Sequence, residues 1–290
     1  MKLFGIDSQF HNAHQNIALE YLLQTKATKG SNYFLSYINN QSIVIGRNQD
    51  AGAELSEAAH SSRLPWYRRT SGGGAVYHDE GNLNWSFVLD GSLEDRPRLL
   101  SAVVDALKPL GLDINADDRG ALFCGRFKIG GTASSQTRGR LLFHGTLLVH
   151  SKLDQLHRGL AAHQPGYPQS HAASSGHSGA VRSRPSETAN LSDLKPGLTI
   201  PDVISLLHSG ISRNLAGRPL AGHPAIIGGR KLPAQPDLPA EKTIMEFSNI
   251  FLSAQWKESR LLPALPTAAA LRSASMPAGV LNYTNRKGNL

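Results

Sequence analysis

Apolar residues in the first half of the chain recur either at helical spacing or in short runs rich in β-branched and aromatic residues. The helical spacing predicts helices over residues 12–25, with Asn12 as a cap, and over residues 98–110, with Gly111 as the stop. Residues 56–62 are predicted to form a shorter helix. The β-type runs predict strands at residues 3–7, 33–38, 42–45, 75–77, 83–89, 122–129 and 141–149.

Two adjacent asparagines, Asn39 and Asn40, separate the second and third predicted strands. Asparagine is common in tight turns because it tolerates unusual backbone angles and bonds to its own backbone. The pair therefore predicts a β-hairpin between residues 33–38 and 42–45.

Patterns in the second half of the chain are weaker. Helices are predicted at residues 201–215, behind Thr199 as a cap, and at residues 241–256. Residues 157–185 are rich in Ser, Gly, His and Pro and contain few large apolar side chains, which predicts a mobile surface loop. The dense alternation of strands and helices before this loop predicts an α/β fold.

Composition places the chain among ordinary globular proteins. It has 290 residues, of which 40% are apolar and 18% charged, enough for one large domain or two modest ones. A single cysteine excludes a disulfide framework and a cysteine-rich zinc site. No apolar run approaches the roughly 18 residues of a membrane span, and the N-terminus lacks signal or transit features. We therefore expect a cytoplasmic protein.

The net charge of +8 is compatible with nucleic acid, a membrane surface or an acidic protein as a partner. The basic residues are scattered as singles and pairs, without a basic block or interleaved aromatic residues. This distribution does not favour nucleic-acid binding. An acidic protein partner is the reading that the charge leaves open.

The most informative motif is Arg68-Arg69-Thr70-Ser71 followed by three consecutive glycines, Gly72 to Gly74. Glycines let a ligand approach the backbone and align N–H donors, while arginines bind anions with a planar fork of donors. The motif predicts a clamp on a phosphate or carboxylate. A plain glycine turn between two strands is the alternative.

Two later positions carry candidate chemistry. Lys128 lies in an apolar run beside Gly130 and Gly131, and a lysine in such a place usually has an anionic partner. His144 precedes a glycine, and taken alone it is most simply a hydrogen-bonded histidine at the core edge. Cys124 has no base nearby in the sequence and is most simply an inert core residue. No histidine group suggests a metal site, so no metal ligand is predicted.

Taken together, these motifs resemble the lipoate–protein ligase A family of the biotin/lipoate ligase superfamily. Residues 68–87 follow the family pattern R-R-x-S/T-G-G-G-A-V-[FY]-H-D-x-G-N-x-N-[FWY]-[ST]-F almost without mismatch. Residues 128–133 resemble its lysine motif, and residues 144–148 its H-G-T-L motif. Residues 42–49 and 181–191 match two further family segments, so that the resemblance covers roughly residues 5–215.

The resemblance implies a mixed β-sheet flanked by helices, related to class II aminoacyl-tRNA synthetases. It also implies a two-step reaction, in which lipoate and ATP give lipoyl-AMP and a lysine of an acceptor domain then takes the lipoyl group. ATP would enter with Mg²⁺. The partners implied are lipoyl domains of 2-oxoacid dehydrogenase complexes or the glycine cleavage H protein, together with a separate accessory-domain chain. Neither nucleic acid nor a membrane is implied.

The resemblance also assigns roles to residues. Lys128 is the catalytic residue and bridges the carboxyl oxygen and the phosphate of the intermediate. The ATP or adenylate site comprises Arg69, Gly74, Ala75, Val76, Tyr77 and Lys128. The lipoate site comprises Gly73, His78, Lys128 and His144.

The chain departs from the family pattern at Gly120 and Ala121, where the family usually has Asn and Asp. We expect a catalytic domain over residues 1–246 and a truncated C-terminal accessory region over residues 247–290. Both departures favour transfer from preformed lipoyl-adenylate over its synthesis. An ATP-independent lipoyl or octanoyl transferase, using an acyl-adenylate or acyl-protein donor, is the alternative. A lipoyl-binding protein without activity is a third reading, against which the intact Arg69, Lys128 and triple glycine argue.

Overall fold

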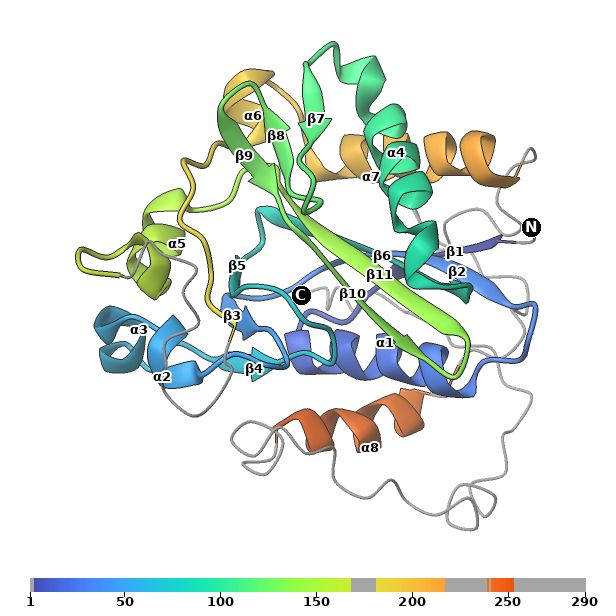
Figure 1. The fold of residues 1–290 in the computed structure, drawn as a ribbon, viewed down its shortest axis with the longest axis horizontal. Helices are drawn as coiled ribbons and strands as arrows, with labels where there is room; N and C mark the ends of the chain where they lie inside the picture. Colours follow the sequence, from blue (N-terminus) through green and yellow to red (C-terminus); the bar gives the residue numbers. More distant parts are fainter. Residues whose placement is uncertain (1–2, 168–180, 217–238, 240, 253–290) are drawn as a thin grey trace, which may run out of the picture.

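A five-stranded mixed sheet forms the centre of the computed structural model, which describes residues 3–167, 181–216, 239 and 241–252. Its strand order is β1-β2-β6-β11-β10 (Figure 1). Strands β1 and β2 are parallel, and the other neighbours are antiparallel. The strands span Leu3–Ser8 (β1), Asn32–Ile38 (β2), Asn82–Asp90 (β6), Thr132–Thr137 (β10) and Arg140–Leu148 (β11).

Two three-stranded sheets accompany the central one. The first has the order β4-β3-β5, and the second has the order β7-β8-β9. The first comprises Ser42–Ile45 (β3), Trp66–Arg68 (β4) and Val76–His78 (β5). The second comprises Ile114–Ala116 (β7), Leu122–Cys124 (β8) and Phe127–Gly130 (β9). The glycine motif and Lys128 therefore belong to different small sheets.

Helices cover both faces of the central sheet. Helix α1 (Ala13–Lys26) packs on one face, and α8 (Glu241–Leu252) packs on the outside of α1. Helices α4 (Arg96–Leu107) and α7 (Ile200–Ile211) pack on the other face and against each other. Four short helices lie at the periphery: α2 (Ala51–Glu54), α3 (Glu57–Ser61), α5 (Leu153–Gly159) and α6 (Leu191–Leu194).

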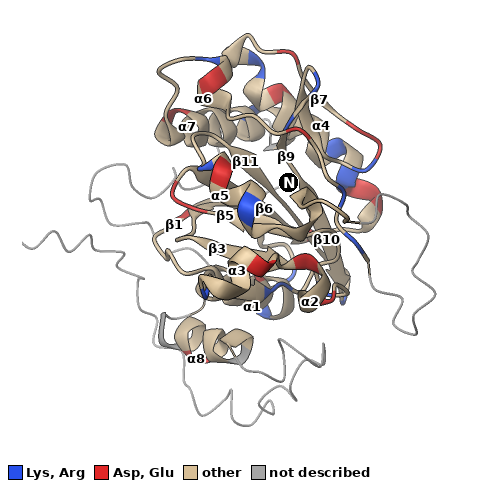
Figure 2. Cartoon of the chain, turned by 90° about the vertical axis from the view of Figure 1, so that its left-hand side faces the viewer, with Lys and Arg blue, Asp and Glu red and all other residues tan. Residues whose placement is uncertain are grey.

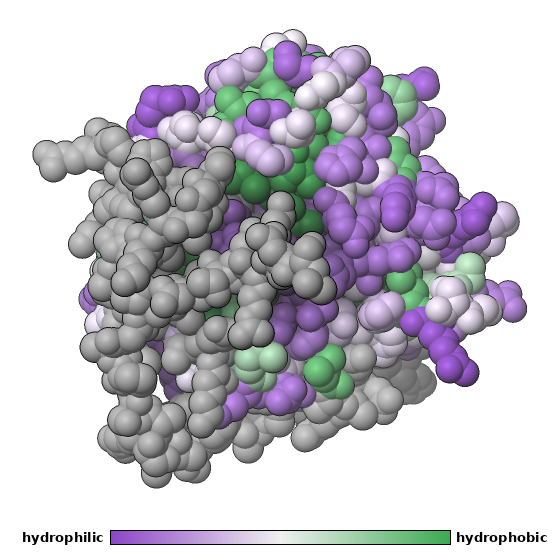
Figure 3. Space-filling view, turned by 180° about the vertical axis from the view of Figure 1, so that it is seen from behind, coloured by the Kyte–Doolittle hydropathy of each residue, from purple (hydrophilic) through white to green (hydrophobic). Residues whose placement is uncertain are grey.

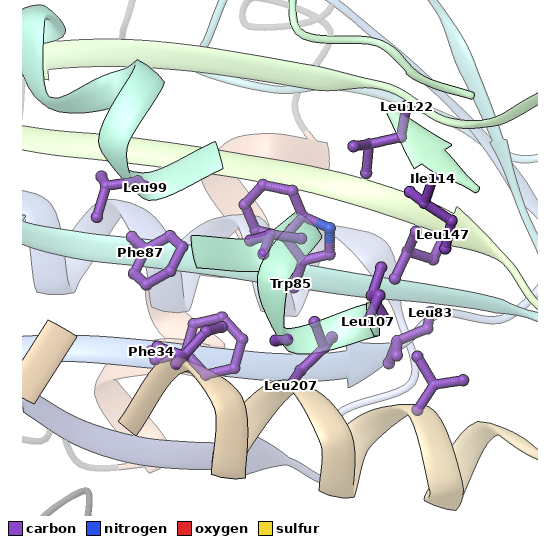
Figure 4. Packing of buried hydrophobic residues seen from close by; sticks show 14 of the residues in the cluster. Phe34, Leu83, Trp85, Phe87, Leu99, Leu107, Ile114, Leu122, Leu147 and Leu207 are labelled. Atoms are coloured by element: carbon purple, nitrogen blue, oxygen red, sulfur yellow. The ribbon is translucent and has the colours of Figure 1, made fainter. Parts of the chain in front are cut away.

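Alternation along the strands divides the core between the two faces. Phe34 and Phe87 face α4 and α7, whereas their neighbours Tyr33, Leu35 and Val88 face α1. Trp85 is fully buried and packs edge-on against Phe87 at a ring-centroid distance of 6.0 Å (Figure 4). It also packs edge-on against Phe143 at 5.4 Å. In β6, Leu83, Trp85 and Phe87 belong to the apolar core on the α4 and α7 side, whereas the alternate residues Asn82, Asn84 and Ser86 are buried polar residues.

The strands and helices predicted from the pattern largely form. Thr199 caps α7 in a capping box with Asp202, and Gly111 ends the turn after α4 with φ +70°. Residues 122–129 form a hairpin, β8–β9, rather than one strand, because Gly125 turns the chain with φ +55°. Strand β10 was not predicted, since its polar sequence, Thr-Ala-Ser-Ser-Gln-Thr, is that of a sheet edge.

The hairpin predicted at Asn39-Asn40 is wrong. Strand β2 pairs with β1 and β6, whereas β3 belongs to the other sheet. Asn39 is 2% exposed, and its side chain bonds to Asn16 and His78. The asparagines therefore mark a crossover between two sheets, in which one of them is held in the interior.

The surface loop predicted over residues 157–185 is wrong at its first end, residues 168–180 lie outside the described residues, and residues 181–185 form neither a helix nor a strand. Residues 157–159 belong to α5, and the buried Tyr167 donates a hydrogen bond to Glu54 at 3.0 Å. At the other end, Ser183 accepts a hydrogen bond from the Ala75 backbone at 2.8 Å. Ser183 therefore connects this loop to the glycine motif.

Helix α8 crosses the expected domain boundary at residues 246–247. Phe247 and Phe251 are buried against α1, with Tyr21 at ring-centroid distances of 6.3 and 5.8 Å. Residues 253–290, the rest of the expected accessory region, lie outside the described residues, as do residues 217–238. No helix in the described part is long and apolar enough to cross a bilayer. Figure 3 shows hydrophilic residues over most of the described surface in that view.

The packing of α8 on α1 leads to a test of stability. Phe251→Ala should lower the free energy of unfolding by about 3–5 kcal/mol, because a fully buried aromatic ring is replaced by a cavity. Leu252→Ala is the matched control: its side chain is 41% exposed, and we expect a change of less than about 1 kcal/mol. Urea unfolding followed by circular dichroism measures both, and equal effects would contradict the packing described.

Candidate active site

A cavity of about 230 Å³ lies between α1, the central sheet, the glycine motif and the β8–β9 hairpin. Eight of the nine residues predicted for the site line it: Arg69, Gly73, Gly74, Ala75, Val76, His78, Lys128 and His144. The exception is Tyr77, whose side chain packs in the core beneath β5. Val76 and His78 flank Tyr77 on the strand, so that their side chains point to the opposite face. Only the backbone of Tyr77 can serve the site.

The glycine loop follows β4 and precedes β5. Gly73 has φ +84°, a backbone conformation that side chains with a Cβ atom rarely adopt. A Cβ at Gly46, just after β3, would collide with the Gly73 carbonyl oxygen. The glycine of the I-V-I-G segment therefore allows two loops to touch at the edge of the cavity.

Arg69 fixes the glycine loop through hydrogen bonds to its backbone carbonyls. Its Nη2 donates to the carbonyls of Gly72 and Gly74 at 2.6 and 2.7 Å, and its Nη1 donates to the Val44 carbonyl at 3.1 Å. Its Nε donates to Ser71 Oγ at 3.0 Å. A guanidinium has five N–H donors, so these four bonds leave one, on Nη1, for other acceptors.

The charge of Arg69 is buried, and Glu20 on α1 is the acidic group that opposes it. Burial lowers the pKa of Arg69 to about 10, and the nearby Glu20 acts in the opposite direction. Glu20 itself accepts from Tyr37 Oη at 2.9 Å and contacts His144 Nδ1 at 3.0 Å. Burial and the negative charge of Glu20 raise the pKa of Tyr37 well above its usual range.

His144 connects Glu20 to Ser71 of the glycine motif. Its Nε2 lies 2.7 Å from Ser71 Oγ, which already accepts a hydrogen bond from Arg69 Nε. The Glu20 carboxylate can only accept, so His144 Nδ1–H donates to it, and Nε2 of the neutral ring accepts from the Ser71 hydroxyl. Ser71 is fully buried and does not line the cavity, so it serves as part of the support rather than as a nucleophile.

Arg68 does not take part in the predicted anion clamp. It is 2% exposed, and its Nη1 donates to the carbonyls of Gly46, Arg47 and Gln49 at 2.6–3.1 Å. Arg68 is the last residue of β4 and Arg69 follows it, and of the two only Arg69 lines the cavity. Arg68 instead organises the loop after β3.

Lys128 lies on β9 at the other side of the cavity. Its backbone N–H donates to the Glu187 carbonyl at 2.8 Å, and its carbonyl accepts from Ala189 at 3.3 Å. Burial lowers the pKa of Lys128, Asp117 raises it and Arg119 lowers it further. Asp117 and Arg119 are exposed and line the same part of the cavity. The ammonium group thus faces the cavity with a carboxylate nearby.

The departure at Gly120 has a local steric reason. Gly120 has φ +84°, and an added Cβ would lie 2.5 Å from Thr132 Oγ1. The same hydroxyl donates to the Gly120 carbonyl at 2.9 Å. Gly120 and Thr132 therefore fit each other, and no side chain from position 120 can enter the cavity.

Several lining residues could not be identified from the sequence motifs. Glu20 and Tyr37 sit within apolar runs, and Asn39 was taken as a turn residue. For Glu20, the sequence offers one indication: it is a charged residue within the apolar stretch of α1. Ser183 was placed in a loop, yet it contacts the glycine loop. Among the described residues, no group of three or more His, Cys, Asp or Glu side chains is arranged to hold a metal ion.

A glycine loop, a buried arginine that bonds to it and a lysine on the opposite side line one cavity. Residues 12–212 match the Lipoyl protein ligase A/B catalytic domain, and the chain belongs to this family. Lipoate–protein ligase 1 of Staphylococcus aureus is 37% identical over 151 residues, which make up 50% of this chain and 45% of that protein. The chain spans about half the length of the curated relatives it matches first.

Solved structures share the fold. Protein Ta0514 of T. acidophilum, solved with bound lipoic acid, is 27% identical with a TM-score of 0.59, over 74% of this chain and 86% of that one. A lipoate–protein ligase A bound with ATP is 23% identical with a TM-score of 0.67, over 90% and 99% of the two chains. A bi-partite T. acidophilum ligase, described with its E2 lipoyl domain, is 24% identical with a TM-score of 0.68, over 91% and 98%. The predicted fold, a mixed sheet flanked by helices, is confirmed.

The left-handed backbone at Gly73 leads to a prediction. Gly73→Ala should destabilise the protein by about 1–2 kcal/mol, because alanine disfavours this φ. Its Cβ would also lie 3.0 Å from Arg69 Nη2. Gly72→Ala is the control, since nothing lies within 4 Å of an added Cβ there. Thermal unfolding compares the two, and equal stability would show that the loop conformation is not required.

The hydrogen bonds of Arg69 lead to a second prediction. Arg69→Lys should lower the free energy of unfolding by about 3 kcal/mol, because one ammonium group cannot reach three carbonyls that lie on different sides of the guanidinium. Arg47→Lys, at an exposed position of the neighbouring loop, should change it by less than about 0.5 kcal/mol. Urea titration of both variants is the measurement, and a wild-type midpoint for Arg69→Lys would rule out this role.

Proposed function

We propose that the protein is a lipoate–protein ligase that activates lipoate with ATP to lipoyl-AMP and transfers the lipoyl group to a lysine of an acceptor domain. Family membership supports the proposal. The observation that carries it is the position of Lys128, a cation that lines the same cavity as the glycine loop.

The reaction needs positioning and charge stabilisation more than a nucleophilic side chain. In the first step the lipoate carboxylate attacks the α-phosphate of ATP and pyrophosphate leaves. In the second step the acceptor lysine attacks the acyl carbon, and AMP leaves as an amide forms. Lys128 would neutralise the carboxyl and phosphate oxygens in both steps, which is the role of a preorganised donor at developing charge.

The other site residues would contact either the nucleotide or the lipoyl chain of lipoyl-AMP. The backbone of Gly74, Ala75, Val76 and Tyr77 would follow the nucleotide, while Arg69 fixes the loop that carries it. Gly73, His78 and His144 would contact the lipoyl chain in the interior, with Lys128 at the junction. The side chain of Tyr77, held in the core, makes no such contact.

The acceptor in this proposal is a lipoyl domain of a 2-oxoacid dehydrogenase complex or the glycine cleavage H protein, met in the cytoplasm. The T. acidophilum ligase described with its E2 lipoyl domain supports the first of these. Mg²⁺ would arrive as the complex with ATP, and a separate chain would supply accessory-domain functions. Figure 2 shows that Lys and Arg positions are interspersed with Asp and Glu positions along the described chain. An acidic acceptor would therefore be recognised through local pairs beside the cavity.

The decisive experiment measures the two half-reactions on the purified single chain. Lipoate-dependent exchange of pyrophosphate into ATP reports adenylation, and lipoylation of an acceptor domain from synthetic lipoyl-AMP reports transfer. Both activities are expected. Transfer without exchange would indicate an ATP-independent transferase, or a need for a second chain, and the absence of both would reject the proposal.

Lys128→Ala should lower the rate of transfer from lipoyl-AMP by 100-fold or more, the size typical for the loss of one donor at developing charge. Arg126→Ala is the matched control on the same hairpin. Arg126 pairs with Glu187 at 3.2 Å on the exposed surface, a contact that contributes little. Single-turnover assays of both variants test the role, and a wild-type rate for Lys128→Ala would reject it.

A further inference from the structure

One polar atom in the cavity has no partner. Among the lining residues, His78 alone has a fully buried side-chain nitrogen or oxygen, Nε2, that makes no hydrogen bond within the described structure. The side chain is 5% exposed. A buried donor or acceptor without a partner costs free energy, so its position in a ligand cavity points to a missing ligand atom.

A chain of hydrogen bonds determines what Nε2 can do. Asn16 Nδ2 donates to the Phe10 carbonyl at 2.8 Å, and this carbonyl can only accept, which fixes the orientation of the Asn16 amide. The same Nδ2 donates to Asn39 Oδ1 at 2.8 Å. The Asn39 amide therefore turns its Nδ2 toward His78 Nδ1, at 2.9 Å.

Because Asn39 donates, His78 Nδ1 must accept, and the proton of the neutral ring lies on Nε2. The ring stays neutral at physiological pH: burial lowers the pKa of His78 to about 3, and the positive charge of Arg69 and the neighbouring His144 act in the same direction. His78 thus presents one N–H donor to the cavity and no charge.

This donor lies at the inner end of the cavity, away from Lys128. Lys128 lies beside Gly131, which is paired with Thr146 on β11. Asn39, which holds His78, follows β2, two strands further across the sheet. Glu20, Tyr37 and His144 are buried at this end, whereas Asp117 and Arg119 are exposed beside Lys128.

We propose that Asn39 is a positioning residue that holds His78 as a neutral Nε2–H donor for an acceptor atom at the buried end of the acyl chain. The inference rests on the proposed function, in which Lys128 binds the carboxyl end. The dithiolane sulfurs of lipoate are weak acceptors, whereas octanoate ends in a methyl group and leaves the donor unpaired. His78, set by Asn39, then selects lipoate over octanoate.

Nitrogen NMR of histidine-labelled protein without ligand tests the positioning directly. His78 should show a protonated Nε2 and an unprotonated Nδ1 from pH 5 to 9, with its signals identified by their absence in His78→Phe. A protonated Nδ1 in the wild-type protein would overturn the inference. This result does not depend on enzymatic activity.

Asn39→Asp tests the consequence for selectivity. A carboxylate at this position accepts from His78 Nδ1–H, so that neutral Nε2 loses its proton. We expect calorimetry at pH 8 to show about tenfold weaker lipoate binding, with octanoate changed much less. Lowering the pH should restore the lipoate affinity of this variant, because the doubly protonated ring again has an Nε2–H, whereas wild-type affinity stays constant.

Asn40→Asp is the matched control: it makes the same chemical change at an exposed neighbour and should keep wild-type affinities. His78→Phe is the second variant, in case Asn39→Asp fails to fold, and should bind the two acids equally. A wild-type preference in His78→Phe, or the same affinity ratio in Asn39→Asp at every pH, would overturn the inference. Binding of neither acid by the wild-type protein would instead reject the proposed function.

Discussion

The site depends on one buried cation, the guanidinium of Arg69. It fixes the carbonyls of Gly72, Gly74 and Val44 and so determines the shape of the glycine loop that forms one wall of the cavity. A charge in this place is tolerated because it is hydrogen-bonded on several sides and because Glu20 lies nearby. Helix α1 carries Glu20, and α8 holds α1 from outside. The geometry of the loop is thereby connected to the packing of helices at some distance from the cavity.

Most of the cavity lining is apolar, as suits an acyl chain, but several buried polar groups lie along it. Its polar groups are paired with one another: Tyr37 with Glu20, Glu20 with His144, and His144 with Ser71. Paired groups present little unsatisfied hydrogen-bonding capacity to an apolar chain, so the desolvation cost is met within the protein. Among the lining residues, only His78 has a buried polar atom, Nε2, without a partner in the described structure. In our proposal this atom distinguishes lipoate from octanoate.

Two small sheets bring the halves of the site together around the central sheet. The β4-β3-β5 sheet carries the glycine loop, and the β7-β8-β9 sheet carries Lys128. Residues 187–189 pair with the backbone of Lys128, and Ser183 contacts the glycine loop. A segment with a loop-like composition thus connects the two walls. Its serines and threonines supply hydrogen bonds that a more apolar segment could not.

The sequence by itself determined the family, most strands and helices, and the residues of the glycine and lysine motifs, because these depend on local geometry: glycine for a positive φ, capping residues for helix ends, and apolar periodicity for the core. Tertiary structure alone decided which side chains meet. Asn39 has the sequence context of a turn residue but is buried beside His78. Arg68 and Arg69 look equivalent in the sequence, but only Arg69 lines the cavity. The partners of Glu20 on α1 come from β2 and β11, positions 17 and 124 residues away along the chain. Contacts of this kind are set by how the sheets and helices pack, and no local pattern in the sequence records them.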